Sequence, residues 1–242
     1  MNLDYNHHLY RKYRLKALSD FDKIKVTYKS VMRRNTMNKF DEQIIVVDRE
    51  TIFSHEKNHF NGFISMEDQR ALEIYETLTK YEVKRRGDME EDERYKQLIS
   101  YCILENESDE ILVYERLAGG GEGRLHGLSS IGIGGHMNRI DNAQIEDVLL
   151  ENAGRELEEE VGVRDVSANA LQLIGFINDD DTEVGRVHIG LVFKLKVASS
   201  DVFVNETDTL KIDWKKEHTL MQNAEYESWS RLIIESIYNV GH

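Results

Sequence analysis

The sequence contains a single cysteine and no proline among its 242 residues. A disulfide needs two thiols, so a bridge within the chain is excluded and a reducing compartment is compatible with the composition. Cys102 lies in the apolar run 98–104, where buried packing is the ordinary role of a cysteine. We therefore do not expect Cys102 to act as a nucleophile.

Long apolar runs are absent as well. No stretch could cross a bilayer, and residues 1–18 lack the apolar centre of a signal peptide. We therefore expect a cytoplasmic protein without a membrane partner. Positive charge is scarce, since 31 Lys and Arg face 45 Asp and Glu for a net charge of -14. This balance argues against nucleic-acid binding by the whole surface and suits anionic substrates that are received locally.

Residues 1–38 differ from this balance. They hold nine lysines and arginines against three aspartates, a local charge of +6, with tyrosines interleaved. Such a basic, aromatic extension either binds nucleic acid or an acidic partner, or folds back onto the acidic body as a helix, and we favour the second. We divide the chain into this extension and residues 39–242, with 39–94 as an N-terminal segment and 95–242 as the core.

Hydrophobic periodicity predicts alternating strands and helices beyond the extension. We expect strands over 43–47, 97–105, 111–117, 171–177, 184–197 and 210–214, and helices over 66–86, 142–161 and 224–238. Ser65 is the expected N-cap of the first helix. Residues 119–135 are rich in glycine but lack a Gly-Lys-Ser/Thr sequence, which excludes a P-loop. Strands interleaved with helices predict a mixed sheet between helical layers.

The most informative segment is the acidic end of the helix predicted over 142–161, which Gly162 terminates. Three carboxylates, Glu156, Glu159 and Glu160, share one helical arc near the C-terminus, where the helix dipole and their mutual repulsion disfavour them. A divalent cation is the simplest counter-charge. The alternative is an ordinary solvated acidic face. The fixed spacing, the terminal glycine and the Gly-Gly pair upstream favour the metal site.

Residues 155–163, Arg-Glu-Leu-x-Glu-Glu-x-Gly-Val, resemble the second half of the Nudix box. Gly134-Gly135 resembles the paired glycines of the first half, but 20 positions separate Gly135 from Arg155 where the box has 14. We interpret this difference as a six-residue insertion around 136–145. Asp147 stands where the family has glutamate. Residues 130–138 also resemble a little-characterised group of Nudix proteins described as phosphoesterases.

The resemblance implies a Nudix-like α/β/α sandwich with a mixed β-sheet, to which the N-terminal extension is added. It also implies an enzyme that hydrolyses phosphoanhydrides with Mg²⁺, or Mn²⁺ in its place. The substrate would be a small molecule, either a nucleoside diphosphate linked to another group or a nucleoside triphosphate. Glu156, Glu159, Glu160 and the Gly134 carbonyl would bind the metal. Glu156, Arg155 and Glu159 would form the catalytic set, with Glu156 as ligand or base and Arg155 as the residue that orients a carboxylate.

Substrate contacts are less defined by the sequence. Gly135 and His136 follow the metal-binding carbonyl, and Arg116 and Arg186 are candidate phosphate-binding cations. Residues 179–183 and Glu206 are alternative bases, although an Asp-rich turn is more often only a turn. Two other functions stay open: a nucleotide sensor that does not hydrolyse, and an RNA-directed hydrolase that docks through residues 1–38. A homodimer is a further open alternative.

Overall fold

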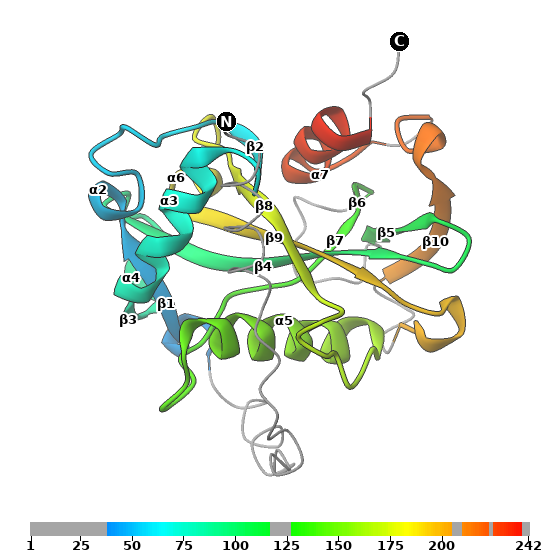
Figure 1. The fold of residues 1–242 in the computed structure, drawn as a ribbon, viewed down its shortest axis with the longest axis horizontal. Helices are drawn as coiled ribbons and strands as arrows, with labels where there is room; N and C mark the ends of the chain where they lie inside the picture. Colours follow the sequence, from blue (N-terminus) through cyan, green and yellow to red (C-terminus); the bar gives the residue numbers. More distant parts are fainter. Residues whose placement is uncertain (1–37, 117–126, 205–209, 223–224, 239–242) are drawn as a thin grey trace, which may run out of the picture.

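The computed structural model describes residues 38–116, 127–204, 210–222 and 225–238 (Figure 1). The basic extension predicted over 1–38 therefore lies outside the described residues, apart from Asn38. Among the described residues, no helix combines the length and the apolar character needed to cross a membrane.

A mixed sheet forms the centre of the molecule. Its main path runs β10-β5-β4-β9-β8-β2, and the pairing is antiparallel except between β4 and β9. These strands are β2 (Gly62–Ser65), β4 (Tyr95–Glu105), β5 (Glu110–Arg116), β8 (Gln172–Asn178), β9 (His188–Lys196) and β10 (Leu210–Lys216). Four others branch from this path: β1 (Gln43–Asp48), β3 (Glu82–Arg85), β6 (Ser129–Ser130) and β7 (Gly132–Ile133).

Helices cover both faces of this sheet (Figure 1). On one face, α5 (Ile145–Val161) and α3 (Gln69–Thr77) pack in a hydrophobic cluster with one side of β4. On the other, α7 (Ser228–Ile233) and the π-helical turn Ile234–Tyr238 pack against the opposite side of β4. Strand β4 is buried on both faces, which explains the predominantly apolar run 98–104. The predicted α/β/α sandwich with a mixed sheet is confirmed.

Short elements complete the fold and join the N-terminal segment to the core. The helical turns are η3 (Lys39–Asp41), α2 (Arg49–Ile52), η4 (Leu78–Lys80), α4 (Arg86–Met89), α6 (Glu183–Arg186), η6 (Ser199–Asp201) and η7 (Glu217–Thr219). Strand β1 pairs with β4 and with β3, so residues 39–94 contribute strands to the same sheet as the core.

The helix predicted over 66–86 is wrong beyond Thr77. The observed helix begins after Asp68, whose carboxylate accepts a hydrogen bond from the backbone N–H of Arg70, so Ser65 is not the cap. After η4 the chain becomes strand β3, in which Val83 lies opposite Ile45 of β1. Cross-strand pairing with a distant segment here outweighs the local helical pattern.

Among the other boundaries that differ from prediction are the starts of β9 and of the C-terminal helix. Residues 183–186 form the helical turn α6, whose Thr182 hydroxyl accepts a hydrogen bond from Gly185 N, so β9 starts only at His188. The C-terminal helix starts at Ser228 rather than 224, because Tyr226 forms an extended bridge with Ser129. Both differences arise from local capping or from contacts between distant segments.

The helix that carries the acidic cluster, α5, ends as the sequence predicts. Gly162 has φ +68, its N–H bonds to the Glu158 carbonyl, and the N–H of Val163 bonds to the Leu157 carbonyl. The bond from Gly162 to Glu158 is that of the αL cap, which glycine permits because it adopts positive φ. The helix begins at Ile145 rather than 142, and Asn142 adopts a left-handed conformation, φ 59, that lies outside helical geometry.

Candidate functional site

Arg155 connects the acidic end of α5 to the segment after the glycine pair. Its Nη1 lies 2.6 Å from Glu156 Oε1 and 3.1 Å from Glu159 Oε2, while Nη2 donates to the His136 carbonyl at 2.9 Å. Arg155 therefore contacts two carboxylates of the helix and the backbone carbonyl of His136 at the same time. The resemblance implied that Arg155 orients a box carboxylate, and these contacts place Arg155 beside two of them.

Glu156 is the buried member of the cluster, with 9% of its surface exposed. A Cβ built on Gly135 would lie 2.8 Å from both carboxylate oxygens, so the absent side chain of Gly135 leaves the space that Glu156 occupies. Burial raises the pKa of Glu156, and the Arg155 cation partly opposes this rise. A carboxylate with a raised pKa is a better proton acceptor than an exposed one.

Gly134 approaches the central strand β4 closely. A Cβ at this position would lie 1.7 Å from the Ser100 carbonyl oxygen, so only glycine fits. The next carbonyl, that of Gly135, accepts a hydrogen bond from Ser100 N at 3.0 Å. Among the described residues, no donor is recorded for the Gly134 carbonyl oxygen. It is therefore the carbonyl that is available to a ligand.

The three glutamates expected to bind the metal, Glu156, Glu159 and Glu160, do not all line one cavity. Glu156 and Glu160 line the same cavity as Gly134, whereas Glu159 is not among the lining residues and its side chain is 44% exposed. Within the described part of the chain, no three Asp, Glu, His or Cys side chains form a cluster that could hold a metal ion. The donors from the box residues that face the cavity, namely Glu156, Glu160 and the Gly134 carbonyl, are oxygens, the ligand type that suits Mg²⁺ with its retained waters.

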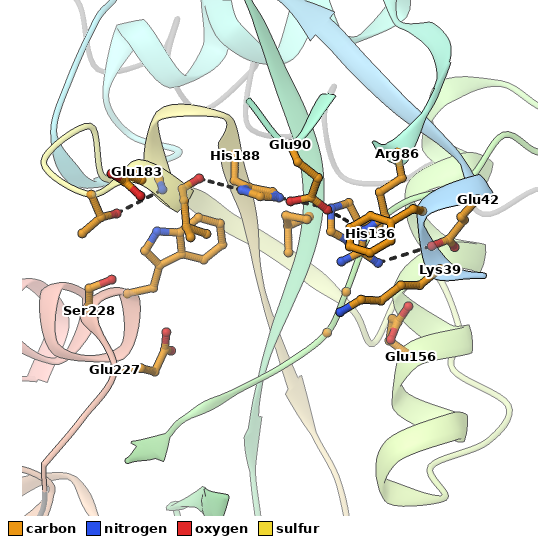
Figure 2. Close-up of a pocket in the computed structure, with 18 of the residues that line it drawn as sticks. Lys39, Glu42, Arg86, Glu90, His136, Glu156, Glu183, His188, Glu227 and Ser228 are labelled. Atoms are coloured by element: carbon orange, nitrogen blue, oxygen red, sulfur yellow. Dashed lines mark hydrogen bonds and ion pairs between the residues drawn. The ribbon is translucent and has the colours of Figure 1, made fainter. Parts of the chain in front are cut away.

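The cavity itself has a volume of about 1070 Å³, at the upper end of the size typical for small-molecule sites. Figure 2 shows its two sides: Glu156, His136, Lys39 and Arg86 gather at one side, and Glu227, Ser228 and Glu183 lie at the other. The walls therefore come from the N-terminal segment, the central strands, α5, the turn before β9, and the start of α7.

Two cations in this cavity were not found by sequence reasoning. Arg86 lies 3.1 Å from Glu90 Oε1 and 3.4 Å from Glu42 Oε2, and it keeps 18% of its side chain exposed. The ammonium of exposed Lys39 reaches into the cavity above the Phe40 ring, 5.5 Å from its centroid. No sequence signal links these residues to the box, because Arg86 was placed in a helix and Lys39 beside the basic extension.

His136 and His188 form a hydrogen-bonded pair on the cavity wall. His188 Nδ1 donates to the Val184 carbonyl at 2.6 Å, so its Nε2 is an acceptor in the neutral ring. His136 Nε2 lies 3.1 Å from that nitrogen and 2.9 Å from the Gln97 Oε1 acceptor, so it carries the proton. Burial and the neighbouring His188 hold the pKa of His136 well below its usual value.

In this tautomer the N–H of His136 is shared between Gln97 and His188, so the neutral ring offers no further donor to a phosphate oxygen. Contact of His136 with the substrate stays a prediction. The first residues of the segment interpreted as an insertion, 136–145, are held by backbone hydrogen bonds to neighbouring strands. Met137 bonds through N–H to Leu98 O and accepts from Ile45 N, which places it between β4 and β1.

The remaining predicted contacts lie in different places. Arg186 pairs with Glu93 at 2.6 Å and does not line the cavity. Arg116 ends β5, but its side chain is outside the described residues, as is Glu206. Of the alternative bases in 179–183, Glu183 lines the cavity.

Asp180 instead belongs to a charged cluster that the sequence did not indicate. Its carboxylate lies 2.6 Å from Lys96 Nζ, 2.8 Å from Arg49 Nη2 and 2.8 Å from His59 Nε2. Lys96 is fully buried and also donates to the Gly185 carbonyl, and burial lowers its pKa to about 8. The three donors hold the pKa of Asp180 below its usual value. The cluster therefore fixes the turn that forms one wall of the cavity.

Comparison with known proteins gives the family. No protein-family model matches the sequence. Protein YmaB of Bacillus subtilis (strain 168) is 42% identical over 205 residues, 82% of this chain and 98% of YmaB. The crystal structure of Tm1382, a protein classed with the Nudix hydrolases, has a TM-score of 0.65 and 30% identity, over 83% of this chain and 100% of Tm1382. The chain therefore belongs to the Nudix hydrolases, enzymes that act on pyrophosphate bonds.

Proposed function

We propose that the protein hydrolyses a phosphoanhydride bond in a nucleoside diphosphate linked to another group, or in a nucleoside triphosphate, with Mg²⁺ or Mn²⁺ as cofactor. One observation carries this proposal. The buried Glu156 carboxylate, held against Gly135 by Arg155, faces the same cavity as Glu160 and the Gly134 carbonyl. Family membership supports the reaction class, and the cavity volume supports a substrate of nucleotide size.

Each residue of the site has a role in this proposal. Glu156, Glu159, Glu160 and the Gly134 carbonyl would hold the cation. When bound, a divalent cation screens phosphate charge and lowers the pKa of coordinated water. Glu156 accepts the proton of the attacking water, a role that its raised pKa favours. Arg155 positions Glu156 and Glu159 rather than the substrate.

The two cations of the cavity complete the proposal. Lys39 and Arg86 line the cavity with Glu156, so their charges lie where an anionic substrate would enter. They belong to residues 39–94, and this segment would therefore contribute to substrate binding. We also propose a cytoplasmic location. Docking of RNA through residues 1–38 and homodimer formation stay predictions.

The test is release of phosphate or nucleotide from a panel of nucleoside diphosphate conjugates and triphosphates, with Mg²⁺ or Mn²⁺. We compare wild type with Glu156→Gln, and use Glu158→Gln as the matched control. Glu158 lies on the same helix but pairs with Arg164, at 3.0 Å, and does not line the cavity. Loss of a general base costs about 10²- to 10⁴-fold in rate.

The expected result is metal-dependent turnover that Glu156→Gln lowers by about 100-fold or more and Glu158→Gln leaves unchanged. Nucleotide binding without turnover across the whole panel would instead indicate a sensing module. Equal losses in both variants would show that the acidic surface, rather than the site, governs activity.

A further inference from the structure

A side lobe opens from the large cavity beneath the start of α7. Its volume is about 110 Å³, the same order as the ~150 Å³ engineered cavities that admit a benzene ring. The lobe shares part of its wall with the large cavity, namely Ile99, Leu128, Gly134, Glu227 and Trp229. Gly134 borders both spaces, and Glu156 and Glu160 line the larger one. A ligand that occupies the lobe could therefore extend from it toward these carboxylates.

Glu227 presents a fixed acceptor to this lobe. Its Oε1 lies at hydrogen-bond distance from four donors: Tyr101 Oη at 2.9 Å, Ser130 Oγ at 3.1 Å, Ser230 Oγ at 2.7 Å and Ser230 N at 3.2 Å. The other oxygen, Oε2, has no recorded partner among the described residues. The network therefore immobilises the carboxylate through one oxygen and leaves the second for a ligand.

Trp229 supplies a rigid aromatic wall beside this acceptor. Its ring packs edge-on against Tyr101, with centroids 5.9 Å apart and planes inclined by 64°. The ring also lies close to Gly190, where a Cβ would come within 2.7 Å of the Trp229 Cζ3 atom. Trp229 is only partly buried and lines both cavities. Its orientation is therefore set by the core while part of the ring remains open to a ligand.

We propose that Glu227 and Trp229 form a subsite for a nitrogenous base that carries an exocyclic amino group. The base would pack on Trp229 and donate an amino N–H to Glu227 Oε2, while the phosphates extend toward Gly134 and Glu156. This subsite deepens the proposed function and rests on it, because the same cavity would have to hold the phosphoanhydride. A planar ring suits the small lobe, and the preformed carboxylate selects a donor over an acceptor.

The substitution Glu227→Gln tests the subsite without removing its support. The amide oxygen can accept the same bonds from Tyr101 and Ser230, while the amide nitrogen replaces the free acceptor by a donor. We place this change in a Trp214→Phe background, because Trp214 is the only other tryptophan. Fluorescence then reports Trp229 alone. The probes are adenosine 5′-diphosphate and purine riboside 5′-diphosphate, which differ only in the amino group.

The Trp214→Phe protein should bind the adenine nucleotide about 10- to 100-fold more tightly than the purine analogue, with quenching of Trp229. Glu227→Gln should abolish or reverse this preference and leave the circular dichroism spectrum unchanged. Equal affinities for the two probes, an unchanged preference in Glu227→Gln, or no binding of either probe would overturn the subsite. If the protein prefers the adenine nucleotide but hydrolyses no phosphoanhydride, the proposed hydrolase activity is refuted and the subsite is not. If it hydrolyses a phosphoanhydride but binds both probes equally, the subsite is refuted and the activity is not.

Discussion

The carboxylate of Glu156 occupies the space that a side chain at Gly135 would need, with both oxygens 2.8 Å from the position of a Cβ there. One residue lies on the segment after β7 and the other on α5, so the glycine sets how closely the helix approaches the strand. The site thus depends on a missing side chain as much as on the carboxylates that are present.

Gly135→Ala should therefore displace Glu156 while leaving the fold intact. We expect kcat to fall by about 10- to 100-fold, since small misplacements of catalytic groups carry costs of this order. The measurement is steady-state turnover together with the thermal midpoint. Gly154→Ala is the matched control, because it lies in α5 and, apart from its chain neighbours and the adjacent backbone of its own helix, no atom of the described residues comes within 4 Å of its new methyl group. That change should preserve activity and raise stability by about 0.5–1 kcal/mol. Equal activity in both variants would contradict the role of Gly135.

Removal of Arg155 should disorganise the acidic end of α5. Arg155→Ala deletes contacts to Glu156, Glu159 and the His136 carbonyl together, so we expect kcat to fall by about 10- to 100-fold. KM should change much less, because Arg155 positions carboxylates rather than substrate. Arg164→Ala removes the other arginine that pairs with this helix end, through Glu158, and should leave kcat unchanged. A change in KM alone for Arg155→Ala would assign it to substrate binding.

Lys96 predicts an unusual dependence of stability on pH. Its pKa is about 8 in the folded protein against an ordinary 10.5, so between these values the unfolded chain binds more protons than the folded one. The free energy of unfolding should therefore rise as pH increases from about 8 to 10.5, by about 3 kcal/mol at most. Below pH 8 the lysine is charged in both states and this contribution is flat.

Urea denaturation of wild type and Lys96→Met at pH 7 to 10 tests this dependence. The variant should lack the rise, because methionine does not titrate. Exposed Lys57→Met serves as the control, since its ammonium pairs only at the surface with Glu73, and its profile should follow wild type. Parallel profiles for wild type and Lys96→Met would show that other groups govern the pH dependence.

Lys39 tests whether the N-terminal segment contributes to substrate binding. Lys39→Gln should raise KM for a nucleotide substrate by up to about fivefold with little change in kcat, the size expected for one exposed ion pair. The difference should shrink as salt is added, because exposed charges are screened. Lys80→Gln, exposed and away from the cavity lining, should behave as wild type. An unchanged KM at low salt would remove Lys39 from the site.

The sequence by itself determined the helix that carries the acidic cluster and the arc that Glu156 and Glu160 share. These features follow from local rules: an apolar repeat sets the helix face, and Gly162 ends the helix because it adopts positive φ. Strand β4 was also predictable from the sequence, because its apolar run reflects burial on both faces. Family resemblance then gave the sandwich around them.

Only the tertiary structure decided what surrounds that arc. Residues 82–85 form a strand because β1 lies beside them, although the local pattern predicts a helix. Tyr101 and Ser230, 129 positions apart, meet around Glu227, and Lys96 meets Asp180 across 84 positions. Sequence periodicity does not predict such contacts between distant residues. These contacts depend on which face of the sheet each helix covers, and on the need to pair charges that are buried away from water.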